Sequence, residues 1–543
     1  MDAGSHEGHF SEKFVAVGVG SFDSSVSRSM KVEASFGRGF SGIQMIGNIG
    51  SIVEDGRERA RMALERLGYQ MPARKMLLSF TPGDRKVDGN HFDLGLAVAL
   101  ACLTAQQVPK VDLSRWVFAA EIGIGGQLRA IKGAIGLAVD CMAEGMDGIV
   151  VANDNAEELQ ALQTACVDLG RPLRFLNFQT LEQVLDWVWG KAGAVGGLSF
   201  LKSPQNIANE ADKSPSPNFD DMILDEELKQ VALVAATGMH SLMLRGVPGC
   251  GKSMFAKRLV SLLPKLSAEE HLTLLQNCSS HREAMSPQVL QGCPPFRNPH
   301  HFASAPAILG AGALPGEAAL AYGGILFMDE FPEFRRDVIE GLREPLETGE
   351  IVVSRAQMKR VWKADLMLVA AANNCPCGWR GSKRRRCECH ETRVVAYRNR
   401  LSGPILDRID LHVNMPERSE SSNPLFAASR TEGVSKTLTM KAMVSEARAF
   451  GLERNKSFGI KLNKQIQTQG LAEILGWTAS ALDTCISSII PSHVSSRSVV
   501  RCLRIARTLA DLKSNPIVAV DDIRKAWSWQ AHQSAVLRGE IFN

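Results

Sequence analysis

Residues 246–253 have the sequence Gly246-Val-Pro-Gly-Cys-Gly-Lys252-Ser253, a glycine-rich turn that ends in a lysine and a hydroxyl side chain. It matches the pattern G-x-x-x-x-G-K-[ST], in which backbone N–H groups wrap a polyphosphate at the N-terminus of a helix. The apolar run 241–245 before the turn predicts a buried strand, and 254–263 after it predicts a helix. The turn therefore predicts an α/β domain with a phosphate-binding loop at the end of one strand.

Side chains of the same loop supply groups that bind a nucleotide. Lys252 can reach the β- and γ-phosphates of ATP, and the Ser253 hydroxyl can ligate Mg²⁺. The residues that we expect to contact ATP are Gly246, Gly249, Gly251, Lys252, Ser253 and Met254. The alternative is a glycine-rich turn without ligand, but an intact Gly-Lys-Ser between a strand and a helix favours the ATP site.

A second apolar run, Gly324-Ile-Leu-Phe-Met-Asp329-Glu330, ends in two carboxylates. A buried parallel strand followed by Asp-Glu predicts that Asp329 holds Mg²⁺ through its water shell, and that Glu330 positions and deprotonates the attacking water. Alone, such a run is usually just the end of a strand. Its place 76 residues after Ser253, in a chain that already has a P-loop, favours the catalytic interpretation.

A third predicted strand, 365–374, ends in two amide side chains. An asparagine at the carboxyl end of a strand beside a P-loop can hydrogen-bond the γ-phosphate or the attacking water. A turn-forming asparagine is the alternative. We expect Asn373 to be the functional amide, by its register in the family named below.

Two arginines are candidates for neutralising charge on the γ-phosphate. Arg408, in Gly403-Pro-Ile-Leu-Asp407-Arg408-Ile-Asp410, is expected to act on the nucleotide of a neighbouring subunit, because phosphoryl transfer gains most from a cation on the developing charge. A surface ion pair with Asp407 or Asp410 is the alternative. Arg497 lies at the start of a basic helix near the C-terminus and is expected to contact the phosphates from a helical lid. Arg501 and Arg504 on the same helix could equally be solvated face residues.

Length and composition are those of a soluble protein with several domains. The chain has 543 residues, of which 45% are hydrophobic and 22% charged, and this length suggests roughly three domains. The longest apolar run, 94–103, is about half the ~18 residues that a membrane helix needs. The first residues are polar and do not resemble a secretory signal. We therefore expect a cytoplasmic protein without a membrane partner.

Shifts in composition divide the chain into six predicted segments. Strand-like alternation occurs at 14–19 and 30–35, and a charged helix is predicted at 54–67. Two polar stretches, the first rich in proline and serine, read as linkers. The segments are a disordered N-terminus at 1–12, an α+β domain at 13–190, a linker at 191–219, an α/β ATPase core at 220–417, a linker at 418–434 and a helical lid at 435–543.

Four of the twelve cysteines lie within fifteen residues, as Cys375-Pro-Cys377 and Cys387-Glu-Cys389. Four thiolates in one loop can satisfy the tetrahedral geometry of Zn²⁺, and we expect a zinc site there, with scattered reduced thiols as the alternative. The residues between the pairs include Lys383, Arg384, Arg385 and Arg386. These side chains either contact the phosphates of a nucleic acid or are simply solvated.

Positive charge is concentrated in one part of the chain. The whole chain has a net charge of +4, but 355–412 has thirteen Lys or Arg against five Asp or Glu. Within this part, 350–355 and 361–365 alternate like the two strands of a hairpin. We expect Arg355, Lys359 and Arg360 to grip DNA phosphates, with an exposed basic hairpin as the alternative.

Six segments carry a family resemblance that covers nearly the whole chain. They are Pro295-Phe-Arg-Asn-Pro-His300-His301, Leu314-Pro-Gly-Glu317, Phe327-Met-Asp-Glu-Phe-Pro-Glu333, Leu342-Arg-Glu-Pro-Leu-Glu347, Ala371-Ala-Asn373-Asn-Cys-Pro-Cys-Gly378 and Gly403-Pro-Ile-Leu-Asp-Arg-Ile-Asp-Leu-His412. With the P-loop, they resemble the YifB/ComM family of magnesium-chelatase-like AAA+ ATPases. The resemblance implies nucleotide-site roles for Lys252, Asp329, Glu330, Asn373, Arg408 and Arg497.

The same resemblance implies a function. It implies an ATP-driven homo-hexameric ring acting on single-stranded and branched DNA, a helicase that promotes branch migration during homologous recombination in natural transformation, with recombination proteins as further partners. The alternative is a chelatase-like motor that remodels a protein partner, as in metal insertion. ATP, Mg²⁺ and Zn²⁺ are the expected cofactors.

The N-terminal domain resembles the ribosomal-S5-like fold that also occurs in the Lon protease, through 88–93 and 121–130. Proteolysis of the Lon type needs a serine nucleophile and a lysine base. The residues at the serine position are Asn90, His91 and Phe92, and those at the lysine position are Ile135 or Gly136. We therefore expect a non-proteolytic domain that binds DNA or supports assembly.

Overall fold

The computed structural model describes residues 13–21, 28–105, 107–168, 174–191, 217–281, 285–312, 314–355, 358–417 and 435–537. The predicted disordered N-terminus and nearly all of both predicted linkers lie outside these residues. The chain divides into two compact units. The first consists of residues up to 211 with 271–291 and 354–360, and the second of 212–270, 292–353 and 361–543.

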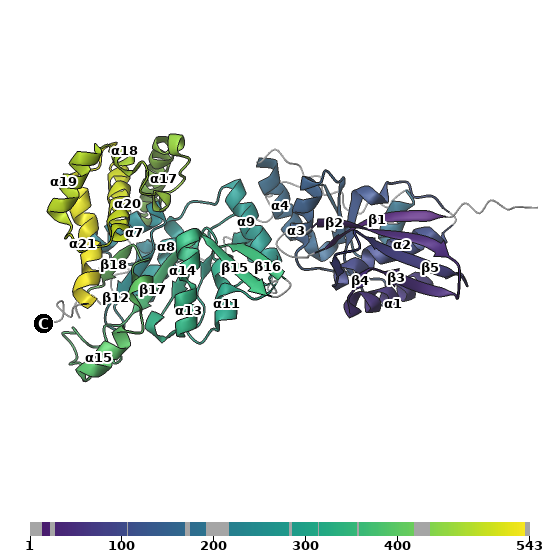
Figure 1. Ribbon diagram of the computed structural model, residues 1–543, viewed down its shortest axis with the longest axis horizontal. Coiled ribbons are helices and arrows are strands. Elements are labelled where there is room, and N and C mark those ends of the chain that lie inside the picture. The colour runs from purple at the N-terminus through teal and green to yellow at the C-terminus, as the bar shows by residue number, and fades with distance from the viewer. Residues whose placement is uncertain are drawn as a thin grey trace, which may run out of the picture. The chain divides into compact units, whose positions relative to one another are not determined.

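A seven-stranded mixed sheet forms the centre of the first unit (Figure 1). Its order is β11 (Phe175–Phe178), β10 (Gly148–Ala152), β7 (Trp116–Ala119), β1 (Phe14–Ser21), β2 (Arg28–Gly37), β5 (Lys75–Thr81) and β3 (Gly42–Ile46). Strands β1, β2 and β5 are antiparallel neighbours, whereas the remaining neighbours are parallel. The strands predicted at 14–19 and 30–35 are confirmed, with wider bounds.

Helices cover this sheet. Helix α2 (Asp93–Thr104) is the predicted apolar run, and nearly all of it is buried. Helix α1 (Ser51–Arg66) packs against it, and begins three residues earlier than predicted. The other elements are β4 (Asn48–Ile49), β6 (Lys86–Val87), β8 (Glu121–Ile122), β9 (Leu128–Arg129), α3 (Ala134–Ala143), α4 (Ala156–Asp168) and α5 (Leu181–Val188).

Residues 271–291 were expected in the ATPase core but group with the first unit. This segment includes most of α9 (Ala268–Ser279) and α10 (Pro287–Leu290). The Ser279 carbonyl accepts from the Gly133 N–H at 2.7 Å, and the Ser279 hydroxyl donates to Glu158 Oε2 at 3.2 Å. Leu275 is fully buried in a cluster with residues of α3 and α4. Buried apolar surface and paired polar groups therefore hold the segment there.

A five-stranded parallel sheet forms the centre of the second unit (Figure 1). Its order is β13 (Phe296–Arg297), β14 (Ile325–Met328), β17 (Met367–Ala372), β12 (Leu242–Arg245) and β18 (Leu411–Asn414). Every residue of β14 and β17 is buried, which is why both strands are continuous apolar runs in the sequence. The α/β core predicted from the P-loop is confirmed. All five carboxyl ends share one edge of the sheet.

Short helices and one hairpin surround the parallel sheet. The helices are α7 (Glu226–Gly238), α8 (Lys252–Leu259), α11 (Ala305–Leu309), α12 (Glu317–Leu320), α13 (Arg336–Gly341), α14 (Arg343–Thr348), α15 (Glu391–Arg398) and α16 (Gly403–Leu406). Strands β15 (Glu350–Arg355) and β16 (Met358–Lys363) form the predicted hairpin, although β16 begins three residues before the predicted start and ends two residues before the predicted end. The end of this hairpin, 354–360, groups with the first unit.

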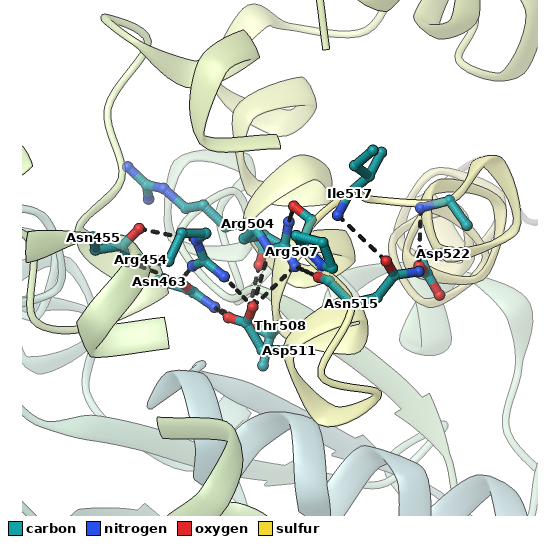
Figure 2. A network of polar contacts seen from close by, with 12 residues as sticks. Arg454, Asn455, Asn463, Arg504, Arg507, Thr508, Asp511, Asn515, Ile517 and Asp522 are labelled. Carbon is teal, nitrogen blue, oxygen red and sulfur yellow. Dashed lines mark hydrogen bonds and ion pairs between the residues drawn. The ribbon is translucent and has the colours of Figure 1, made fainter. Parts of the chain in front are cut away.

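The C-terminal part of the second unit consists of helices held by a buried polar network. The helices are α17 (Lys436–Arg454), α18 (Leu471–Leu475), α19 (Ala479–Ile489), α20 (Ser496–Leu512) and α21 (Val520–Leu537). In Figure 2 the Asp511 carboxylate, 1% exposed, accepts from Arg454, from Arg507 at 3.1 Å and from Asn463 at 2.7 Å. A buried carboxylate is tolerated because these donors compensate its lost hydration.

A buried histidine ties α20 to the parallel sheet. His240 Nε2 lies 2.9 Å from Thr508 Oγ1, and its Nδ1 lies 3.3 Å from Asp410 Oδ2. His240 and Asp410 both precede the amino ends of strands, so α20 is fixed at that edge of the sheet. Among the described residues, no helix has the length and hydrophobicity needed to cross a bilayer.

Candidate nucleotide site

The P-loop follows β12 at the carboxyl edge of the parallel sheet. Gly249 and Gly251 have φ values of +77° and +100°, which residues with a side chain rarely adopt. Gly251 is the N-cap of α8, so the loop leads directly into a helix N-terminus, where backbone N–H groups are free to bind an anion. Gly246 lies at the start of this loop, and Met254 lies in the first turn of α8. Helix α8 begins at Lys252, two residues before the predicted start.

The Lys252 ammonium is buried and has three oxygen acceptors. It donates to the Gly246 carbonyl at 2.8 Å, to the Val247 carbonyl at 3.1 Å and to Asn373 Oδ1 at 3.0 Å. An ammonium has three N–H donors, so these acceptors satisfy it fully. A phosphate that enters the loop competes for the same donors. Lys252 and Asn373, which sequence analysis placed in one site, are therefore in direct contact.

The Ser253 hydroxyl donates to Asp329 Oδ2 at 2.7 Å. Ser253 lies in α8, and Asp329 directly follows β14, so the contact joins the P-loop to the second strand of the site. A hydroxyl and a carboxylate are oxygen ligands of the kind that Mg²⁺ takes beside nucleotide phosphates. The residues present therefore fit a magnesium ion, which Ser253 and Asp329 would hold beside the phosphates.

Glu330 makes a contact that the sequence did not predict. Its Oε2 atom lies 3.1 Å from His301 Nδ1, while its side chain remains 53% exposed. Glu330 has a φ of +53°, an uncommon conformation for a residue with a side chain, and this conformation turns the chain sharply after Asp329. The His301 ring packs near Phe302 and Phe334. In the sequence, His301 stands out only as part of a family segment. Its position after β13, the parallel neighbour of β14, is the signal that places it at this edge.

The opposite edge of the sheet borders a cavity of about 850 Å³. Its lining includes Ser241, Asp365 and Asp410, which precede β12, β17 and β18. Strands of this length separate the two edges by ~13–20 Å. The cavity and the P-loop are thus on opposite sides of the sheet.

Two arginines lie in this cavity and share one carboxylate. The Arg408 guanidinium pairs with Glu347 and donates to the Pro404 carbonyl at 2.8 Å, while Arg497 Nη2 lies 3.4 Å from Glu347 Oε1. Hydrogen bonding to Arg408 holds the pKa of Glu347 below its usual value. Neither ion pair expected as the alternative for Arg408, with Asp407 or Asp410, is the contact seen.

The phosphate contact expected of Arg497 from a helical lid stays a prediction. The structure places Arg497 at the amino edge of the sheet, on the opposite side from the P-loop of the same chain. The reason is the attachment of α20, which carries Arg497 and is fixed at that edge by Thr508 and His240. The buried Arg501, one turn further along α20, also donates to the Ile409 carbonyl at 3.5 Å.

Comparison with known proteins identifies the family of the chain. The family model "Magnesium chelatase, subunit ChlI" matches residues 218–423, and models of the ChlI subunit and its C-terminal part match 32–155 and 435–530. YifB of Escherichia coli is 32% identical over 504 residues, which cover 92% of this chain and 94% of YifB. The competence protein ComM of Haemophilus influenzae is 30% identical over 503 residues, covering 92% of this chain and 94% of ComM.

The chain belongs to the YifB/ComM family. It is a magnesium-chelatase-like AAA+ protein with an ATPase-type nucleotide site. The family resemblance stated from the sequence is thereby confirmed.

The four clustered cysteines of this YifB/ComM protein lie together. The Sγ atoms of Cys375 and Cys377 are 3.4 Å apart, and each lies 3.6 Å from Cys387 Sγ. Ligand atoms of these three and Cys389 all lie within 4.8 Å of one another, and no disulfide joins them. Tetrahedral Zn–S bonds of ~2.3 Å place sulfur atoms about 3.8 Å apart, so the four thiols fit Zn²⁺.

The basic residues between the cysteine pairs are exposed. Lys383, Arg384, Arg385 and Arg386 all face solvent. Glu417 holds the base of this segment, because its carboxylate accepts from the Lys383 N–H at 2.7 Å and from the Ser382 hydroxyl at 2.8 Å. Arg385 lies over the Trp379 ring, 5.4 Å from its centroid. The segment therefore has an ordered base and solvent-facing cations.

Arg360 differs from the prediction that it grips DNA. Its guanidinium donates to the Ser280 hydroxyl at 3.4 Å, and burial lowers its pKa to about 10. The end of the hairpin groups with the first unit, and the side chain of Arg360 is only partly exposed. The side chains of Arg355 and Lys359 lie outside the described residues, and their DNA contacts stay a prediction.

Proposed function

We propose that this protein is an ATP-driven DNA motor, a cytoplasmic ring that promotes branch migration when incoming single strands recombine during natural transformation. The observation that carries this proposal is the Ser253–Asp329 hydrogen bond of 2.7 Å, since it joins the P-loop to the magnesium-binding strand. Lys252, Glu330 and Asn373 complete the groups that ATP hydrolysis needs at the same edge. The relative named competence protein ComM supports the pathway.

The positions of Arg408 and Arg497 support a ring. Both guanidinium groups line a cavity on the opposite side of the sheet from their own P-loop. A nucleotide bound there must come from another subunit, and repetition of one such contact around an axis closes a ring. We propose a homo-hexamer in which both arginines reach the γ-phosphate of the neighbouring nucleotide. Glu347 neutralises them until that phosphate arrives.

The exposed basic segment supports a nucleic-acid partner. Lys383, Arg384, Arg385 and Arg386 present four cations on a base ordered by Glu417. Such cations bind the phosphate backbone without reading sequence, as a motor that moves along DNA requires. We propose that single-stranded and branched DNA contact this segment, and that Arg355 and Lys359 of the hairpin add further contacts.

We also propose that Cys375, Cys377, Cys387 and Cys389 hold one Zn²⁺ per chain, which supplies a structural crosslink within the loop. The sulfur spacing supports this assignment. Elemental analysis of protein purified under reducing conditions tests it: one zinc per chain is expected, and no metal contradicts the assignment.

The N-terminal unit has a separate proposed role. We propose that it is a ribosomal-S5-like, non-proteolytic module for assembly or DNA binding. The buried His91, 4% exposed, stands in the segment where Lon-type proteolysis needs its serine, and this supports a role other than peptide cleavage.

A second candidate function is the remodelling of a protein partner, as in metal insertion. The family models named for magnesium chelatase favour it. The two functions are separated by phosphate release measured with no nucleic acid, with single-stranded DNA and with forked DNA, together with displacement of a labelled strand. A DNA motor gives at least several-fold stimulation and ATP-dependent displacement. Equal hydrolysis in all three conditions, without strand displacement, contradicts the DNA motor. Glu330→Gln is the inactive control.

A further inference from the structure

The loop that carries the cysteine cluster rests on the P-loop. A Cβ atom at Gly378 would lie 2.5 Å from Pro248 Cγ, 2.8 Å from Pro248 Cδ and 3.8 Å from Asn373 Cγ. Gly378 also has a φ of +86°. The absence of a side chain is therefore needed twice, for the turn and for the close approach to the Pro248 ring. Backbone from the cysteine loop lies in van der Waals contact with the nucleotide loop.

A hydrogen-bonded turn joins this contact to the cysteines. The Gly378 N–H donates to the Cys375 carbonyl at 2.9 Å, and the Arg380 N–H donates to Cys375 Sγ at 3.3 Å. The Asn374 amide closes the turn by donating to the Arg380 carbonyl at 3.1 Å. Residues 374–380 thus form one compact turn that includes two of the four thiols.

The same turn begins immediately after Asn373. Asn373 accepts a hydrogen bond from Lys252, and Cys375 follows Asn373 by two residues. The end of β17 therefore lies between the P-loop lysine and the turn that carries the cysteines. Cys375 is fully buried, whereas Cys377 is exposed. The turn that carries Cys375 and Cys377 approaches the P-loop through Gly378 and Pro248.

From this geometry we propose that metal binding at the cysteine cluster and nucleotide binding at the P-loop are thermodynamically coupled through the turn 374–380. The inference rests on the proposed zinc site. With four thiolates crosslinked, the turn has one conformation, which supports Pro248 and Asn373. Without the crosslink the turn samples others, and nucleotide binding must restore its order.

Coupling of this kind is reciprocal. If loss of the metal weakens nucleotide binding by some factor, bound nucleotide must strengthen metal binding by the same factor. We expect about tenfold in each direction, which lies within the usual range of coupling between sites. If the turn contributed only to the stability of the fold, the changes in nucleotide affinity and in zinc affinity would not be equal.

The test uses full-length protein in two metal states. The affinity for a non-hydrolysable fluorescent ATP analogue is measured with zinc bound and after removal by a chelator. In parallel, the affinity for zinc is measured by competition with a colorimetric chelator, with and without the unlabelled analogue. About tenfold weaker nucleotide binding without zinc, and about tenfold weaker zinc binding without nucleotide, are expected.

Gly378→Ala tests the contact between Gly378 and Pro248 independently of the metal. It keeps all four thiols but adds a methyl group against Pro248 at a positive φ, so we expect zinc to stay bound while nucleotide affinity falls. Gly68→Ala is the matched control, because Gly68 has the same φ of +86° with no atom within 4 Å of an added Cβ. The coupling is contradicted if the protein binds zinc but neither removal of the zinc nor Gly378→Ala changes the nucleotide affinity. That result would leave the zinc site itself unchallenged. If the purified protein binds no zinc, both the zinc site and the coupling are overturned.

Discussion

The amide oxygen of Asn373 lies 3.0 Å from the ammonium of Lys252. Asn373 follows β17 and Lys252 follows β12, and these two strands are neighbours in the parallel sheet. The two side chains therefore hold one another at the place where a γ-phosphate would lie. This contact joins the lysine proposed to bind the phosphates to the asparagine proposed to sense the γ-phosphate.

Asn373→Ala should leave ATP binding nearly intact and slow hydrolysis by about 10²-fold, because Lys252 retains two carbonyl acceptors while a transition-state hydrogen bond is lost. The analogue affinity and the rate of phosphate release measure the two effects separately. Lys252→Ala is the comparison and should lose both. Unchanged phosphate release in Asn373→Ala would remove Asn373 from the catalytic site.

His301→Ala should raise hydrolysis in the absence of DNA by several-fold, because the Glu330 carboxylate loses the partner 3.1 Å away that holds it. Stimulation by single-stranded DNA should shrink correspondingly. His300→Ala is the matched control, since the His300 ring accepts from the Phe302 N–H and stacks on Phe302. A loss of activity as deep as that of Glu330→Gln would instead show that His301 assists catalysis.

Charge reversal at Lys383 and Arg386 should weaken binding of single-stranded DNA and flatten its salt dependence by about 0.7 in log–log slope for each lost phosphate contact. Fluorescence anisotropy at several salt concentrations measures both quantities. Lys456→Glu, at a position 77% exposed in the C-terminal helices, is the control. An equal effect from that control would mean that the binding follows net charge alone.

Glu158→Gln should stabilise the first unit at alkaline pH. Burial raises the pKa of Glu158 to about 7, from an ordinary value of 4.5. The folded carboxyl keeps its proton where the unfolded one is ionised. Stability is therefore fully present below about pH 4.5 and is lost as pH rises through about 7, by on the order of 3 kcal/mol. An uncharged glutamine removes this loss.

Amide hydrogen exchange of residues 156–168 at pH 8 measures this change in stability in the helix that contains Glu158. Glu158→Gln should exchange more slowly than the natural chain at pH 8 and nearly equally at pH 5. The exposed neighbour Glu157→Gln should change neither. Faster exchange in Glu158→Gln at pH 8 would mean that the ionised carboxylate is the stabilising form.

The strands, and the positions of the residues proposed to be catalytic, were predictable where local patterns determine them. The P-loop requires positive φ at Gly249 and Gly251, and the buried parallel strands β14 and β17 appear as apolar runs that end in Asp329 and Asn373. Contacts that no motif or strand end marks were not predictable. Nothing near Arg497 shows that Thr508 and His240 fix its helix at the far edge of the sheet.

Insertion of a segment into another unit was also hidden in the sequence. Residues 271–291 follow the P-loop helix and look like part of the same domain, yet Ser279 and Leu275 pair and pack with α3 and α4. The same packing partly buries Arg360, which its sequence pattern predicts as a cation that grips DNA. Charge and periodicity in the sequence indicate whether a side chain is polar or apolar, but the residues that it contacts depend on tertiary packing.

Mixing two inactive variants tests the shared nucleotide site most directly. Lys252→Ala keeps the arginines but lacks the P-loop lysine, and Arg408→Ala has the converse defect. Each alone should hydrolyse ATP at under about 1% of the natural rate. Equal mixing should restore up to about a quarter of it, because that share of the contacts in a random ring pairs an intact loop with an intact arginine. No recovery in rings shown by mass measurement to contain both variants would contradict a site completed by the neighbouring subunit.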